Sequence, residues 1–305
     1  MKSLKINLLT LIALWVTTSL FGAAAPTPAP SSPSEDGVNQ IKAFLVSGNV
    51  TIRDANNVTK SVARNDLIPV GSTVLTDGTG TALLVFSNGA AMQIKPNSEI
   101  AILKYEQEHF DTAKDGTFLR LNADPSKSTT ELDVHKGTLT GEVKKLNLAA
   151  DSSFTVDTPA GSAGIRGTLP TFTVERDSTG KVTSVSVSCA EGTISFKPAT
   201  IAGVPGTAFD IQKGGASKVA LATDVNGNVQ SITVAGATFT GAEAQTIIDS
   251  LYSAVNEVRT SQGLPPVTPP PPPPPNPPNT SGNGGDARPN PPVVPTNNTV
   301  PVISE

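Results

Sequence analysis

The stretch Thr158–Glu175 reads TPAGSAGIRGTLPTFTVE and decides how the chain is interpreted. Three glycines recur in it at every third position, namely Gly161, Gly164 and Gly167. Phosphate-binding loops show similar spacing, but they need a helix that begins at the glycines and points its amide groups at the anion. Here Pro170 and the alternating run TFTVE follow, and both favour a strand over a helix. The stretch is therefore predicted to be a turn and a strand that close a β unit.

On this interpretation the glycines allow tight turns or a close approach of two backbones. Arg166, the one cation of the stretch, is expected to pair with a nearby carboxylate. Valine at Gly164 or Gly167 is then expected to damage folding, whereas Arg166→Lys leaves partner binding largely intact.

Short β-like segments lie on both sides of this stretch. Thr81–Phe86, TALLVF, and Ala91–Ile94 flank an Asn-Gly pair, which is the strongest short hairpin signal because both residues tolerate a positive φ. In Lys181–Cys189 valine and cysteine alternate with serine, a pattern typical of a half-buried strand. Residues 106–130 are predicted to be a polar excursion in which Phe118, Leu119 and Leu121 could add one strand.

The period of the sequence changes after residue 200. Strands are predicted between residues 208 and 240, paired across Gly214-Gly215 and across Asn226-Gly227. Thr240 and Glu243 form a capping box, and apolar residues then recur at helical spacing, so one amphipathic helix is predicted over Ala242–Thr260. Its apolar stripe either closes the β-domain or binds a partner. Pro269–Pro275 are seven prolines, which indicate a polyproline II spacer or a recognition segment.

The first residues resemble a secretory signal peptide. Lys2 and Lys5 precede an apolar run from Ile6 to Phe21, and three alanines end at Ala25, where cleavage is expected. The chain is therefore predicted to be periplasmic or secreted; the alternative is an uncleaved membrane anchor. The expected divisions are a signal peptide (1–25), a linker (26–37), a β-domain (38–200), further strands with the helix (201–262) and a disordered Pro-rich tail (263–305).

The composition of the chain limits the kinds of partner and site that it can have. Among 305 residues the net charge is −4, which argues against a nucleic-acid partner. The single cysteine, Cys189, forms no intramolecular disulfide or cysteine-rich metal site, and its place on an apolar strand face favours an inert core residue. His109 and His135 lie in no nucleophile motif and are expected at the surface. No catalytic, cofactor-binding or metal-ligating residue is predicted, and no cofactor.

Seven segments then carry a family resemblance. They occur in the order Gly48-Asn49-Val50, Leu67–Thr76, Thr81–Ile94, Pro96–Ile100, Lys136–Val143, Phe154–Val174 and Val185–Ile194. Together they resemble the FecR domain, the extracytoplasmic domain named after the ferric-citrate sensor. The resemblance implies an all-β, solenoid-like or sandwich-like unit that serves binding or signalling. Regulatory members have a cytoplasmic region before a membrane span, whereas only five residues precede the apolar run here, so an anti-sigma role is not expected.

The sequence thus predicts a non-catalytic binding or scaffolding module of the bacterial cell envelope. Its expected partner is an envelope protein or a glycan, with no nucleic acid and no membrane span after cleavage. One alternative is a signal-transducing sensor remnant retained by an uncleaved anchor. A further alternative is an envelope hydrolase that depends on His109 and His135. Composition leaves the oligomeric state open.

Overall fold

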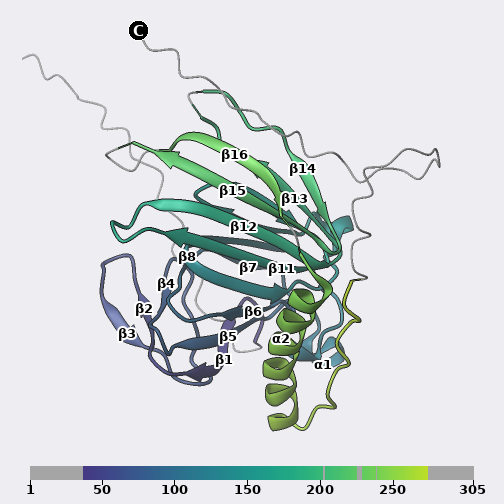
Figure 1. Ribbon diagram of the computed structural model, residues 1–305. Coiled ribbons are helices and arrows are strands. Elements are labelled where there is room, and N and C mark those ends of the chain that lie inside the picture. The colour runs from purple at the N-terminus through teal and green to yellow at the C-terminus, as the bar shows by residue number, and fades with distance from the viewer. Residues whose placement is uncertain (1–36, 202, 225–228, 238, 274–305) are drawn as a thin grey trace, which may run out of the picture. The chain divides into compact units, whose positions relative to one another are not determined.

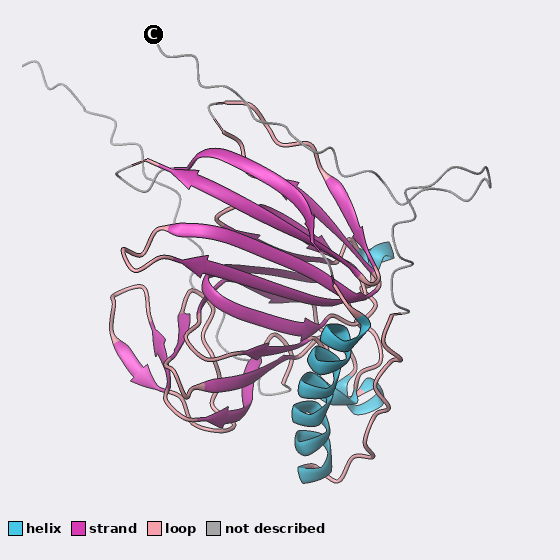
Figure 2. Cartoon of the chain, viewed as in Figure 1, coloured by secondary structure: helices cyan, strands magenta, loops and turns pink. Residues whose placement is uncertain are grey.

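The computed structural model describes residues 37–201, 203–224, 229–237 and 239–273. The expected signal peptide, nearly all of the linker and residues 274–305 of the tail lie outside the described residues. The described chain is dominated by strands, with one long helix (Figures 1 and 2). The all-β prediction is therefore confirmed.

The strands form one hydrogen-bonded sheet that is divided into two layers. Layer A consists of β1 (Ile41–Ser47), β5 (Thr81–Phe86), β6 (Ala91–Ile94), the end of β8 (Ser128–Glu142), β11 (Leu169–Arg176), β12 (Val182–Glu191), β15 (Gly215–Thr223) and β16 (Val229–Ala237). Layer B consists of β2 (Val50–Arg53), β3 (Thr59–Ser61), β4 (Thr73–Thr76), β7 (Glu99–Gln107), the start of β8, β9 (Ser153–Thr158), β10 (Gly161–Ile165), β13 (Thr193–Pro198) and β14 (Phe209–Gln212).

Strand β8 joins the two layers. Its first part, up to Lys136, pairs with β7 and runs parallel to β9 in layer B. Its last part, from Gly137 to Glu142, pairs with β6 and β11 in layer A. The strand therefore bends at Gly137, whose φ of 80° lies in the left-handed region.

After β8 the chain adds strands in pairs, alternately to each layer. The pairs β9–β10 and β13–β14 extend layer B, and β11–β12 and β15–β16 extend layer A. The chain crosses between the layers after β10, after β12 and after β14. Each of these three connections contains a glycine with a positive φ, namely Gly167, Gly192 and Gly214. The fold is sandwich-like in its layers and solenoid-like in its repeated additions.

The main core lies between the layers. Phe86 of layer A packs edge-on against two rings of layer B, with centroids 5.1 Å from Tyr105 and 6.1 Å from Phe154. In TALLVF alternate residues point to opposite faces: Leu84 joins this core, whereas Leu83 and Val85 join a second cluster on the outer face of layer A. Because both faces of β5 are buried, the strand is a continuous apolar run.

Helix α2 (Gly241–Ser261) covers the outer face of layer A (Figure 1). Its capping box is present, with the Glu243 amide donating to Thr240 Oγ1 at 3.1 Å and the Thr240 amide to the Glu243 carboxylate at 2.7 Å. Its buried stripe consists of Ala244, Ile248, Leu251, Tyr252, Val255 and Val258. The predicted helix is confirmed, and its apolar stripe closes the β-domain. None of the described helices is long and apolar enough to cross a membrane.

The segment after α2 runs back along the helix. Asn256 and Val267 exchange two hydrogen bonds of 3.0 and 2.8 Å, and Val267 packs on the cluster under the helix. Pro273 lies beside Gly241, at the other end of α2. Nine residues of polyproline II and a 21-residue helix both span about 30 Å. Residues 264–273, expected in the tail, are therefore packed on the helix.

Two local predictions were wrong. Phe118–Arg120 forms a short 3₁₀ helix after α1 (Thr112–Asp115), rather than a strand, because Phe118 turns to pack edge-on against Phe44 at 5.3 Å. A second 3₁₀ helix covers Leu148–Ala150. Gly214-Gly215 is not a hairpin turn, since β14 pairs with β13 whereas β15 pairs with β12 and β16.

Candidate binding face

The stretch Thr158–Glu175 crosses from one layer to the other. Its first half is β10, between β9 and β13 in layer B, and its second half is β11, between β8 and β12 in layer A. No helix begins at its glycines, so the prediction of a turn and strand rather than a phosphate loop holds. The stretch does not close the unit, however, because strands continue beyond it in both layers.

Alternate residues of β9, β10 and β13 form a polar patch on the outer face of layer B. Gly164 lies opposite Thr155 on one side and Ser195 on the other, and Ser162 lies opposite Asp157 and Lys197. All six are partly or fully exposed. We call Thr155, Asp157, Ser162, Gly164, Ser195 and Lys197 the Gly164 patch. Within it, the hydroxyl of Ser162 donates a hydrogen bond to the Asp157 carboxylate.

Gly164 has no structural reason to be a glycine. Its φ lies outside the left-handed region, and a Cβ there would meet only the Ser195 carbonyl oxygen, at 3.9 Å. By contrast, a Cβ at Gly161 would lie 2.3 Å from the Lys197 carbonyl oxygen. A glycine within a strand often marks a place where another molecule approaches the backbone. The structure therefore offers no steric reason for valine at Gly164 to damage folding.

We expect Gly164→Val to fold as stably as the wild type or slightly better. Valine favours strands, and it removes the extra conformational entropy of a glycine, worth about 0.5–1 kcal/mol. Thermal unfolding followed by circular dichroism measures this, with Gly161→Val as the matched variant that should unfold at a much lower temperature. Equal losses in both variants would contradict the prediction.

Arg166 follows the Gly164 patch along the outward side of the chain. It is exposed, and among the described residues it makes no ion pair, so the expected carboxylate partner is not found. Gly167 beside it has a φ of 61°, which valine would tolerate poorly. Exposed cations therefore flank the patch, with Lys197 beside Ser162 at one end and Arg166 beyond Gly164 at the other.

His135 lies in a charged cluster on the same layer, on β8. Its ring nitrogens lie 3.1 Å from the Asp133 carboxylate and 3.6 Å from that of Glu99, which also pairs with Arg53. The hydrogen bond to Asp133 raises the pKa of His135. Burial alone would raise the pKa of Glu99, but Arg53 and His135 together outweigh burial and lower it. His135 and His109 are partly or fully exposed, as predicted.

Cys189 is fully buried on the core side of β12. Burial raises the pKa of its thiol to about 12, and the thiol donates to the Glu191 carbonyl oxygen at 3.2 Å. The thiolate, which is the reactive form, is thus scarce at neutral pH. The prediction that Cys189 is a core residue is confirmed, and its raised pKa is consistent with the predicted lack of reactivity.

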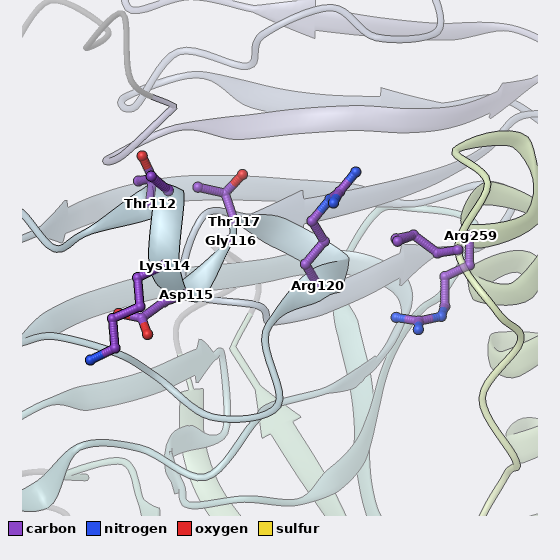
Figure 3. A pocket seen from close by; sticks show the side chains of 9 residues that line it. Thr112, Lys114, Asp115, Gly116, Thr117, Arg120 and Arg259 are labelled. Carbon is purple, nitrogen blue, oxygen red and sulfur yellow. The ribbon is translucent and has the colours of Figure 1, made fainter.

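A polar hollow of about 500 Å³ lies between the excursion and the end of α2. Arg259, on its wall, donates to the carbonyl oxygens of Leu119 and Pro265, and so ties the helix to two loops. Figure 3 shows that Lys114 points away from Arg120 and Arg259. The three cations do not converge on one ligand position, and the hollow is a weaker candidate than the Gly164 patch.

The predicted Asn-Gly hairpin is present, but its tip is buried. Ser87 and Asn88 are 0% and 2% exposed beneath the excursion. The Asn88 amide group donates to Ser128 Oγ at 3.0 Å, and that hydroxyl donates to Asp124 Oδ2 at 2.7 Å. Burial raises the pKa of Asp124, and among the described residues no group hydrogen-bonds its other oxygen.

The Asp124 carboxyl should make the stability of the fold depend on pH. The pKa of Asp124 is higher in the folded than in the unfolded chain. Its contribution to the free energy of unfolding is therefore fully present below the unfolded pKa of about 3.8, and it is lost as pH rises through the folded pKa. We expect the melting temperature of Asp124→Asn, relative to wild type, to rise between pH 4 and pH 7. A difference that does not change with pH would show that the carboxyl titrates normally.

The comparison with family models agrees with the sequence resemblance. Residues 72–195, from the start of β4 to β13, match the family model described as FecR protein. No curated protein matches. Two crystal structures of a candidate anti-sigma factor from Parabacteroides distasonis ATCC 8503 resemble the chain, with 8% and 9% identity and TM-scores of 0.36 and 0.38.

Those likenesses cover 56% and 57% of this chain. They cover 62% and 64% of the other chains, less than two thirds of their length. The family match includes the whole stretch Thr158–Glu175 and five of the six residues of the Gly164 patch together with Arg166. Residues 72–195 of this chain form a FecR domain, as their sequence predicts.

Proposed function

We propose that the chain is a non-catalytic binding or scaffolding module of the bacterial cell envelope, and that its partner docks on the Gly164 patch. The observation that carries this proposal is the open, exposed glycine at position 164, in a strand that is paired on both sides. Glycine weakens a strand, and this position has room for a side chain. A partner that needs the backbone to be accessible is a physical reason for its presence.

The chemistry of the patch suits an extended polar chain. Hydroxyls of Thr155, Ser162 and Ser195 both donate and accept hydrogen bonds, and the gap at Gly164 lets a ligand lie flat. Lys197 adds positive charge at one end of the patch, and Arg166 adds it beyond the other end. A glycan strand bearing carboxylates, or an extended acidic peptide of an envelope protein, presents the complementary groups.

The chain's nucleophilic and basic groups support a non-catalytic role. The Cys189 thiol is buried with a raised pKa, and the His135 ring is held between the carboxylates of Asp133 and Glu99. Export is supported by the leader-like residues 1–25. Sequencing the N-terminus of the protein recovered from cells tests the export, because cleavage after Ala25 leaves a chain that begins at Pro26.

A photo-crosslinking residue placed at Gly164 tests the docking site in living cells. We expect a discrete adduct from this position and none from the same residue at Ala220, which is exposed on layer A. If the partner is a glycan, wild-type protein should co-sediment with purified envelope polysaccharide, and Gly164→Val should bind at least tenfold more weakly. Equal adducts at both positions, or no adduct and no co-sedimentation, would refute the proposal.

A further inference from the structure

Strand β16 ends layer A. It pairs with β15 along one edge, and no other described strand lies on its second edge (Figure 1). An open edge carries unpaired amide and carbonyl groups that can pair with another strand. The other three edge strands, β1, β3 and β14, each carry a charged residue: Lys42, Lys60 and Asp210. The nine residues of β16, VQSITVAGA, include no charge and no proline.

The core side of β16 is also incompletely covered. Val187 on β12 and Val219 on β15 are 0% exposed, whereas Ile232 and Val234 on β16 are only half-buried although they pack on the same core. Natural edges are commonly protected by charges, prolines or bulges. The described part of the β16 edge lacks charges and prolines. It has apolar side chains and a row of backbone amide and carbonyl groups that no described strand pairs with, as expected of a strand that has a partner.

The sequence of β16 is complementary to itself about its central residue. If two copies pair antiparallel with Thr233 opposite Thr233, all nine residues find a partner. Ile232 then faces Val234 of the other copy, and Ser231 faces Ala235. No like charges meet across this two-fold axis, whereas β3 would place Lys60 opposite itself and β14 would bring the two copies of Asp210 close together.

We propose that two copies of this chain associate through β16, which makes layer A continuous across a two-fold axis. Such an interface is isologous, because the same strand contributes on both sides. Backbone hydrogen bonds supply the attachment, and the Ile232 and Val234 side chains that are partly exposed in one chain become covered. This inference stands apart from the Gly164 patch, which lies on layer B.

Light scattering during gel filtration of the exported chain measures the mass directly. We expect twice the mass of one chain for wild type and the single mass for Val234→Lys, since lysine can reach solvent from a free edge but not from the paired one. Ala220→Lys, on the outward side of β15, is the matched control and should remain a dimer. Circular dichroism checks that both variants are folded.

Single cysteines then test the register. Thr233→Cys should form an intermolecular disulfide, because the two copies of this position lie opposite each other. Ser231→Cys and Ala235→Cys should not, since each faces the other and not itself. The native Cys189 is buried and does not interfere. A protein that remains a monomer at about 100 µM, or equal crosslinking at all three positions, would overturn the proposal.

Hydrogen exchange distinguishes the remaining occupants of the edge. If the protein is a monomer and the outward amides of β16 are nevertheless protected, another segment of the same chain covers the edge and the proposal is wrong. If these amides are protected only when an envelope extract is added, the occupant is a foreign strand, and the proposal is again wrong. Protection that falls on dilution, together with the mass, supports the two-fold pairing.

Discussion

Replacement of Gly137 by alanine should prevent the chain from folding. The φ of 80° alone costs an alanine about 1–2 kcal/mol. The added Cβ would lie 2.2 Å from Ser98 Oγ, 2.6 Å from Ser98 Cα and 2.7 Å from the Asn97 carbonyl oxygen. Two of these atoms belong to the backbone and cannot turn away. A domain with a total stability of about 5–15 kcal/mol has little margin for such an overlap at the bend that joins its layers.

The variant Gly180→Ala separates the cost of the positive φ from the cost of the steric overlap. Gly180 has nearly the same φ, 85°, but no atom would lie within 4 Å of its added Cβ. We expect this variant to lose only about 1 kcal/mol. Soluble yield and urea unfolding measure both variants. If Gly137→Ala were no less stable than Gly180→Ala, the close contact between the bend of β8 and Ser98 would not matter to the fold.

Local patterns of the sequence were enough for local structure. The Asn88-Gly89 pair specified a hairpin because two residues that tolerate positive φ stood between apolar runs. The Thr240–Glu243 capping box and the apolar spacing after it specified α2 to within a residue at each end. Both signals act over a few residues. The burial of the hairpin tip depends instead on Tyr105 and Ser128, which are 17 and 40 residues from Asn88, and no local pattern encodes it.

The alternation of the chain between the two layers corresponds to a repeated tripeptide in the sequence, which inspection of single segments does not reveal. Three tripeptides repeat almost unchanged: Gly137-Thr138-Leu139, Gly167-Thr168-Leu169 and Gly192-Thr193-Ile194. Each glycine has a positive φ where the chain changes layer, and a Cβ at Gly192 would lie 2.7 Å from the Gly167 carbonyl oxygen. The corners at Gly167 and Gly192 therefore lie against each other. Comparing the tripeptides with one another would have predicted the crossings that each alone did not.

The candidate binding site could not be predicted from the sequence because the structure of β10 also depends on contacts between distant segments. β10 reads GSAGI, which has low strand propensity, and it is a strand only because β9 and β13 hold it from both sides. The sequence shows three equally spaced glycines but not how they differ. Gly161 and Gly167 have positive φ, whereas Gly164 is extended and open. That difference singles out Gly164 as a candidate binding position, and it arises from the pairing of β10 with β9 and β13.

The second large effect is expected at the interface between α2 and layer A. Leu251 is fully buried in the cluster that includes Leu83 and Val85 of β5. Leu251→Asp places an uncompensated carboxylate there and removes apolar contacts, and these effects together should cost more than about 3 kcal/mol. Ser253→Asp, exposed on the same helix, is the matched control and should change stability by less than about 0.5 kcal/mol.

The manner of unfolding is as informative as its extent. Leu83 and Val85 alternate with core residues of the same strand, so a chain without α2 exposes apolar groups on the outer face of β5. We therefore expect Leu251→Asp to lower the midpoint of a single urea transition, with α2 and the sheet unfolding together. A variant that loses its helical circular dichroism while the strand signal stays unchanged would show that α2 is a removable cover. In that case the helix, rather than the sheet, would become the first place to look for a partner.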